Sequence, residues 1–209
     1  MQTPTLAEAR FRTKPATLST NASAFRTGFA MKLRLLFLSL FIIGGHTLLA
    51  EVDAGRPTSG TPYDRYLGPV RQVHARSGSN TPTLDEVRAH LRTARRFRYF
   101  FNKAEPYIPQ DPAVTEAQQQ GDCKAKSVWL ANKMLDRNVR YVVGKAKPDS
   151  KMSHAWLLWS NGGEWLFLDP TMEFDVVNAD GVAGRKLIIQ YSYKGSTAYS
   201  HPSYKDYVK

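Results

Sequence analysis

Two runs of aromatic and β-branched residues, separated by a turn sequence, constrain this chain more than any other feature. The first run covers residues 154–159, the second covers 165–168, and Asn161-Gly162 lies between them. Asn-Gly is the strongest two-residue signal for a β-hairpin, because a type I′ turn needs positive φ at both central residues. The sequence therefore predicts an antiparallel hairpin over residues 154–168.

The predicted turn also fixes which residues lie opposite each other. If Asn161 and Gly162 form the loop, His154 lies directly across from Asp169, close enough for the carboxylate to accept a hydrogen bond from the imidazole. If Gly163 joins the loop, a shift of one residue puts the two side chains on opposite faces of the sheet. Taken alone, His154 fits a core histidine equally well, and Asp169 fits a turn residue before Pro170.

Helical patterns precede the hairpin. Thr83 and Glu86 have the spacing of a capping box, and apolar residues then recur at steps of three and four: Leu84, Val87, Leu91, Ala94 and Phe97. The arginines of this segment lie largely off that stripe, which indicates a solvated basic face: Arg88, Arg92, Arg95, Arg96 and Arg98. A second helix is predicted over 122–137, with Asp122 as its N-cap.

Strand-like runs dominate the rest of the chain. They cover 139–143, 154–159, 165–168 and 186–193, and all are rich in aromatic and β-branched residues. Residues 102–112 carry Pro106, Pro109 and Pro112, which predicts an irregular and fairly rigid connection. Helices followed by a mostly antiparallel sheet predict an α+β domain over 83–209.

Cys123 is the only cysteine of the 209 residues. It follows Gly121-Asp122 at the start of the second predicted helix, where the helix dipole and unpaired backbone N–H groups favour a thiolate. The Cys123 N–H is also well placed to donate to a developing oxyanion. The neighbouring Asp122 carboxylate opposes the thiolate, so a cation is needed nearby. A free cysteine can also be a small buried hydrophobic residue, and the count alone does not separate the two roles.

The beginning of the chain has the layout of a secretory leader. Met31 is followed by Lys32 and Arg34, an apolar run over 35–43, and a cleavage site for a signal peptidase near Ala50. The run is short for a membrane span, although an N-terminal anchor or a buried helix would share its composition. Residues 31–50 are therefore predicted to be a signal peptide, and if translation begins at Met31, residues 1–30 are an artefact of the start site. Export to the periplasm or the medium follows.

The segment over 51–82 is rich in Gly, Pro, Ser, Thr and Arg, which predicts a linker or an extended arm. Residues 1–50 hold six Lys or Arg and one Glu, so only +6 of the net charge of +11 belongs to the remainder. That moderate charge favours anionic surfaces such as those of the cell envelope. No base-reading motif accompanies it, so nucleic acid is not an expected partner.

Three blocks of the sequence resemble the motifs of the transglutaminase-like superfamily, which includes bacterial transglutaminase-like cysteine proteinases. They are Gly-Asp-Cys-Lys-Ala-Lys-Ser at 121–127, His-Ala-Trp at 154–156 and Leu-Asp-Pro-Thr at 168–171. The resemblance covers about residues 100–175. It implies a papain-like core in which Cys123 is the nucleophile, His154 the base and Asp169 the orienting acid.

The same resemblance implies a thiol hydrolase that cleaves peptide or amide bonds through an acyl-enzyme. An amine-accepting transglutaminase and a catalytically silent binding module with this fold are the alternatives. Gln118 is the expected oxyanion side chain, because papain-like enzymes use a glutamine upstream of the cysteine. No cofactor or metal is expected, and the sequence contains no clear calcium motif. The expected partner is a protein or peptide substrate, and no membrane span should remain after processing.

Overall fold

The computed structural model describes residues 55–103, 107–179 and 187–201. The predicted signal peptide over 31–50, the segment over 1–30 and Pro106 all lie outside the described residues. Within the described part of the chain, no helix is long and apolar enough to cross a lipid bilayer.

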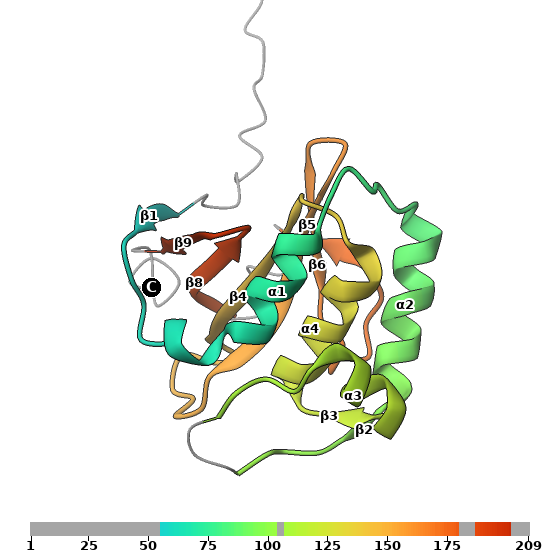
Figure 1. The fold of residues 1–209 in the computed structure, drawn as a ribbon, viewed down its shortest axis with the longest axis horizontal. Coiled ribbons are helices and arrows are strands. Elements are labelled where there is room, and N and C mark those ends of the chain that lie inside the picture. The colour runs from blue at the N-terminus through green and yellow to red at the C-terminus, as the bar shows by residue number, and fades with distance from the viewer. Residues whose placement is uncertain (1–54, 104–106, 180–186, 202–209) are drawn as a thin grey trace, which may run out of the picture. The chain divides into compact units, whose positions relative to one another are not determined.

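In the described residues, a layer of helices covers a seven-stranded sheet (Figure 1). The strand order is β1-β9-β8-β4-β5-β6-β7, and every neighbouring pair runs antiparallel. The strands span Arg56–Thr58 (β1), Val139–Lys145 (β4), His154–Asn161 (β5), Glu164–Leu168 (β6), Val177–Asn178 (β7), Ile188–Lys194 (β8) and Thr197–Ser200 (β9). A separate parallel pair consists of β2 (Arg98–Tyr99) and β3 (Gln120–Gly121).

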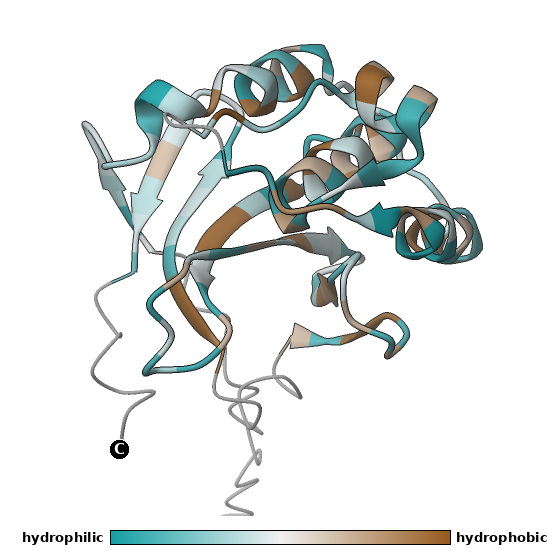
Figure 2. Ribbon diagram, turned by 90° about the horizontal axis from the view of Figure 1, so that it is seen from below, coloured by the Kyte–Doolittle hydropathy of each residue, from teal (hydrophilic) through white to brown (hydrophobic). Residues whose placement is uncertain are grey.

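The helices lie to one side of the curved sheet (Figure 2). They are α1 (Gly68–Arg76), α2 (Leu84–Arg96), α3 (Pro112–Gln118) and α4 (Cys123–Met134), with a 3₁₀ turn, η1, at Asp64–Tyr66. Alternate residues of the strands face different cores, as the two-residue period of a strand requires. Leu157 and Trp159 pack in the core shared with the helices, whereas Trp156 and Leu158 pack in a second cluster with Phe167. The predicted α+β class is confirmed, and Cys123 is the first residue of a helix that packs on an antiparallel sheet.

Local signals in the sequence start and stop these helices. The capping box predicted at Thr83 and Glu86 is present, and each side chain bonds the backbone N–H of the other residue. Asp122 caps α4 as predicted, accepting from the N–H groups of Lys124 and Ala125. The helix ends at Met134, three residues before the predicted end, because Leu135 adopts a left-handed conformation with φ of 47°.

Part of the predicted linker is ordered and packed. It contains β1 and α1, and Val70 and Val73 of α1 are buried in the main core. Pro69 stands in the first turn of α1, where proline is well tolerated because that N–H has no partner within the helix. The segment over 51–82 therefore contains a short helix that its Gly- and Pro-rich composition did not indicate.

The hairpin between β5 and β6 forms, but its turn lies one residue later than predicted. Asn161 pairs with Glu164, and Gly162 and Gly163 form the two-residue loop with φ values of 61° and 90°. A type I′ turn needs positive φ at both positions, and two glycines adopt it without Cβ strain. The register differs from the predicted one by two residues in the partner strand, so each side chain stays on its predicted face.

Candidate active site

Cys123 begins α4 and is 4% exposed. Asp122 precedes it as the N-cap, and its Oδ1 accepts hydrogen bonds from the N–H groups of Lys124 (2.9 Å) and Ala125 (3.1 Å) and from the hydroxyl of Tyr107. Burial raises the pKa of Tyr107, as does the charge of Asp122, so this hydroxyl stays protonated and donates. The negative charge of Asp122 is thus held by three donors at the helix start, which lessens its conflict with a thiolate.

His154 and Asp169 are in contact, as the sequence predicted. The His154 Nε2 lies 2.7 Å from the Asp169 Oδ2, and the side chains are 14% and 0% exposed. The other carboxylate oxygen of Asp169 accepts from the N–H (2.8 Å) and the hydroxyl (2.7 Å) of Thr171. Asp169 is therefore fixed on both oxygens and holds the imidazole in one orientation.

The environment of His154 favours the imidazolium. Burial by itself lowers the pKa of this histidine, but hydrogen bonds and negative charge from Asp169 and Cys123 outweigh it and raise the pKa to about 10. The hydrogen bond to Asp169 uses Nε2, so Nδ1 is the nitrogen available to the sulfur of Cys123. The geometry supplies the cation that the sequence analysis required beside Cys123, and it suits a thiolate–imidazolium pair.

Two buried polar contacts dock α4 beside the strand that carries His154. Ser127, one turn after Cys123, donates from its hydroxyl to the carbonyl of Ala155 at 3.2 Å. The ammonium of Lys126 donates to the carbonyl of Phe97 at 2.6 Å. Because backbone carbonyls accept both bonds, the helix start is held at a defined distance from β5 and from the segment that leads into β2.

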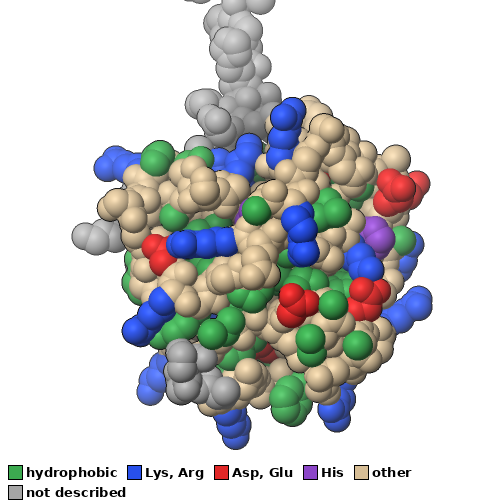
Figure 3. Space-filling model, viewed as in Figure 1, with side chains coloured by type: hydrophobic (Ala, Val, Ile, Leu, Met, Phe, Trp, Pro, Cys, Tyr) green, Lys and Arg blue, Asp and Glu red, His purple; other side chains and the backbone are tan. Residues whose placement is uncertain are grey.

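Arg95 also belongs to this region, contrary to the solvated face predicted for the arginines of α2. Its guanidinium is half-buried and donates to the carbonyl oxygens of Asp169 (3.4 Å) and Phe174. Burial lowers the pKa of Arg95, while the charges of Asp175 and Asp169 act in the opposite direction. Arg95 therefore secures the loop after β6 behind Asp169. Other basic side chains are scattered over the face shown in Figure 3 and do not gather into one stripe.

Tyr99 is a neighbour of Cys123 that the sequence analysis did not find. β2 pairs with β3 so that Tyr99 lies beside Gly121, and Tyr99 is close enough to Cys123 for the two side chains to interact electrostatically. Burial raises the pKa of Tyr99 to about 12, and the charges of Cys123 and Asp122 act in the same direction. The phenol therefore lies near the N–H group expected to bind an oxyanion. No local pattern indicated it, because the contact joins segments that are distant in sequence.

Gln118 ends α3 and is exposed. Its side-chain oxygen Oε1 accepts hydrogen bonds from the side-chain amides of Gln110 (2.9 Å) and Gln120 (3.1 Å). The role of Gln118 as the oxyanion side chain stays a prediction, and in the free protein it is Tyr99 that contacts Cys123.

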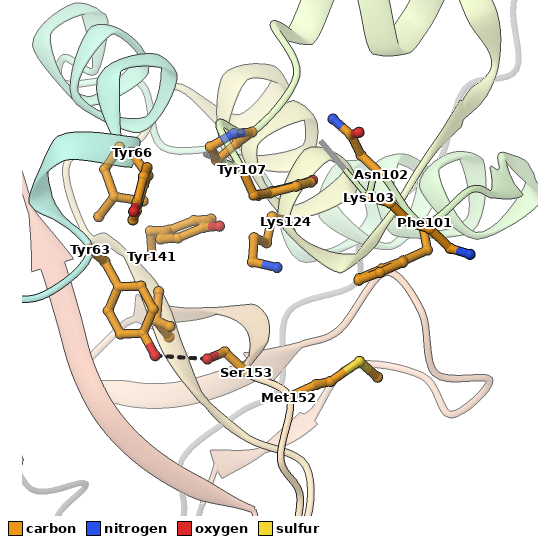
Figure 4. A pocket seen from close by; sticks show the side chains of 13 residues that line it. Tyr63, Tyr66, Phe101, Asn102, Lys103, Tyr107, Lys124, Tyr141, Met152 and Ser153 are labelled. Carbon is orange, nitrogen blue, oxygen red and sulfur yellow. Dashed lines mark hydrogen bonds between the residues drawn. The ribbon is translucent and has the colours of Figure 1, made fainter. Parts of the chain in front are cut away.

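A cleft of about 370 Å³ is lined by the chain neighbours of Cys123 and His154, although neither of these two residues lines it (Figure 4). Lys124 and Ser153, the chain neighbours of these two residues, both line it. In the described ranges, no group of three or more His, Cys, Asp or Glu is placed to hold a metal ion.

Comparisons with known proteins give resemblances in fold only. No family model matches the chain, and no curated relative does. Legionella pneumophila LapG, treated with EGTA, is similar with a TM-score of 0.49 at 14% identity, over 66% of this chain and 75% of that one. Its calcium-bound form has a TM-score of 0.46 at 14% identity, over 69% and 86%. A proposed cysteine protease from Cytophaga hutchinsonii has a TM-score of 0.41 at 17% identity, over 62% and 44%.

Proposed function

We propose that this protein is an exported thiol hydrolase that cleaves peptide or amide bonds through Cys123, His154 and Asp169. The observation that carries the proposal is the arrangement of the three side chains. A cysteine at a helix start lies close to an imidazole, and a buried carboxylate holds that imidazole at 2.7 Å. Nucleophile, base and orienting acid in this order of contact are the signature of covalent acyl transfer.

The reaction proceeds in two halves. The Cys123 thiolate attacks the carbonyl carbon, and the electron pair moves onto the carbonyl oxygen. When the tetrahedral intermediate collapses, the C–N bond breaks, and the His154 imidazolium gives its proton to the departing amine. Neutral His154 then takes a proton from water, which attacks the thioester and releases the acid and the thiolate. Asp169 stays ionised and stabilises the imidazolium each time it forms.

The backbone N–H of Cys123 is the first donor for the oxyanion. Tyr99 lies close to Cys123 and is 54% exposed. A second donor such as Gln118 would have to come from a rearrangement of the segment before β3. Water is the default acceptor for the acyl group, since no site for an amine is defined by the described side chains.

The decisive experiment uses the single cysteine. Iodoacetamide labelling followed by mass spectrometry reports on one atom, so its rate against pH measures thiolate reactivity in wild type and in His154→Ala. We expect fast labelling in wild type that drops in His154→Ala. A cleavage assay on a peptide library, with Cys123→Ala as the control, then identifies substrates. A slow thiol that His154→Ala leaves unchanged would instead identify a silent binding module.

Adding a primary amine to the same assay separates hydrolysis from cross-linking. A hydrolase releases free carboxylate with or without the amine, whereas a transglutaminase forms the amide product. Export is a separate part of the proposal and rests on the pattern over 31–50. N-terminal sequencing of the protein from its native host should give a mature chain that starts near residue 51, and an intact leader on a cytoplasmic protein would contradict it.

A further inference from the structure

The cleft lined by Lys124 and Ser153 is rich in aromatic and basic side chains. It lies between η1 and the start of α1, the segment that follows β2, the first turn of α4, strand β4, and the two residues before β5 (Figure 4). Aromatic rings form much of its wall: Tyr63, Tyr66, Phe101, Tyr107 and Tyr141. The residues on either side of the scissile position in a bound peptide would pass this cleft, because Lys124 and Ser153 adjoin Cys123 and His154.

Two hydroxyl groups of this wall make hydrogen bonds to protein partners, and a third does not. The Tyr63 hydroxyl lies 2.7 Å from the Ser153 hydroxyl, and the Tyr107 hydroxyl donates to Asp122. Tyr141 is 0% exposed, and its hydroxyl has no hydrogen-bond partner among the described residues. Burial raises the pKa of Tyr141 well above its usual value, and the charges of Cys123 and Asp122 act in the same direction. Tyr141 thus presents a protonated donor that lacks an acceptor, a costly state for a buried hydroxyl.

The charged groups of the lining are cationic. Lys124 points into the cleft, its side chain is 18% exposed, and its ammonium lies 4.2 Å above the ring of Tyr107 (Figure 4). Lys103 lies at another wall, and none of the described residues that line the cleft is Asp or Glu. The Asp122 Oδ2 lies 4.0 Å from the Lys124 ammonium, and the other oxygen of this carboxylate is held by three donors.

We propose that this cleft selects an acidic side chain, Asp or Glu, next to the bond that the protein cleaves. The proposal rests on the proposed hydrolase function and names its substrate class. A carboxylate would accept from the Tyr141 hydroxyl and pair with the Lys124 ammonium. A lysine or arginine side chain would be repelled, and an apolar one would leave Tyr141 without an acceptor. A glutamine would accept from Tyr141 but would not pair with the charge of Lys124.

The test measures peptide binding to Cys123→Ala, which cannot turn substrate over. Blocked, fluorescently labelled peptides carry Glu, Gln, Lys or Leu at each position in turn, and fluorescence anisotropy gives the Kd. At one position we expect Glu to bind about tenfold more tightly than Gln, the size of one charge-assisted hydrogen bond. Adding Lys124→Gln should reduce this Glu-to-Gln preference to near unity. Adding Tyr141→Phe should weaken the Glu and the Gln peptides together.

A matched control is available on the same helix. Lys133 lies near the other end of α4 and pairs with Glu116 at 2.8 Å, so Lys133→Gln removes the same charge away from the cleft. The preference for Glu should survive in this variant. Equal binding of all peptides, a preference for Lys or Leu, a Glu preference that persists in Lys124→Gln, or no binding of any acidic peptide would each overturn the proposal.

Cleavage by the wild-type protein separates this inference from the proposed function. A Glu preference in binding without any cleavage that depends on Cys123 would remove the hydrolase and leave the acid-selective cleft. Cleavage that depends on Cys123 but not on an acidic residue at any position would keep the hydrolase and remove the acid-selective cleft.

Discussion

Replacing Asp169 with asparagine tests the active site most directly. In the native protein, Oδ2 accepts from His154 and Oδ1 accepts twice from Thr171. An asparagine has one oxygen and one NH₂, so it cannot satisfy both partners. If its oxygen stays with Thr171, the NH₂ faces Nε2 and forces the proton onto Nδ1, which then cannot take the proton of Cys123. If the amide turns, the NH₂ meets the donors of Thr171.

The cost follows from these contacts. A hydrogen bond to a charged group contributes about 1.5–3 kcal/mol, and 1.36 kcal/mol corresponds to tenfold in rate, so kcat/KM should fall by about 10- to 10²-fold. The pKa of His154, about 10 in the native protein, should fall towards 6.5 in Asp169→Asn. NMR titration of the imidazole measures this pKa, and initial rates on a substrate that Cys123→Ala does not cleave give kcat/KM.

Asp136→Asn makes the same isosteric change at another buried acid. Asp136 accepts from the Trp159 indole at 2.8 Å and lies beyond the far end of α4. This variant should lose stability and retain activity per folded molecule. If Asp169→Asn were as active as wild type, or if His154 titrated unchanged, Asp169 would be only a turn residue.

Three further variants follow from the structure. His154 has a raised pKa of about 10, so its stabilising effect is complete below pH 6.5 and is lost as pH rises through 10. The free energy of unfolding of wild type should therefore approach that of His154→Gln as pH rises over this range. A difference that stays constant with pH would refute the ion pair. Gly144→Ala would place a Cβ 1.9 Å from the Ile188 carbonyl oxygen, so chemical denaturation should show a loss of at least about 2 kcal/mol, where a near-neutral change would contradict the packing. Tyr99→Phe removes a hydroxyl that lies close to Cys123, so iodoacetamide labelling should be about 2- to 10-fold faster, and an unchanged or slower rate would count against Tyr99 as a cover on the thiol.

The His154–Asp169 contact was predictable because a strand has a period of two. The predicted turn was wrong by one residue, since Gly163 and not Asn161 accompanies Gly162 in the loop. Moving a two-residue loop by one position changes the pairing by an even number of residues, so both side chains keep their face. A loop of three residues would have separated them.

The remaining features depend on contacts that local patterns do not encode. Tyr99 reaches Cys123 only because β2 pairs with β3, and a two-residue parallel pair has no sequence signature. Arg95 lies on the edge of the helical stripe, where periodicity cannot distinguish solvent from the carbonyl of Asp169. Val70 and Val73 of α1 gave too short a pattern to stand out from a Gly- and Pro-rich background.

The β2–β3 pair also determines how the site can open without unfolding. Only two residues on each side join the segments that carry Tyr99 and precede Cys123, whereas α4 is anchored through Ser127 and Lys126. Such a short ladder is expected to separate at a lower free energy than the sheet, as a small cooperative unit. Amide hydrogens at Phe100 and Arg98, bonded to the carbonyls of Gly121 and Gln119, should therefore exchange well before those of β4 and β5. The reactivity of the thiol would then follow this local opening. Denaturant concentrations too low to unfold the domain would leave that reactivity unchanged.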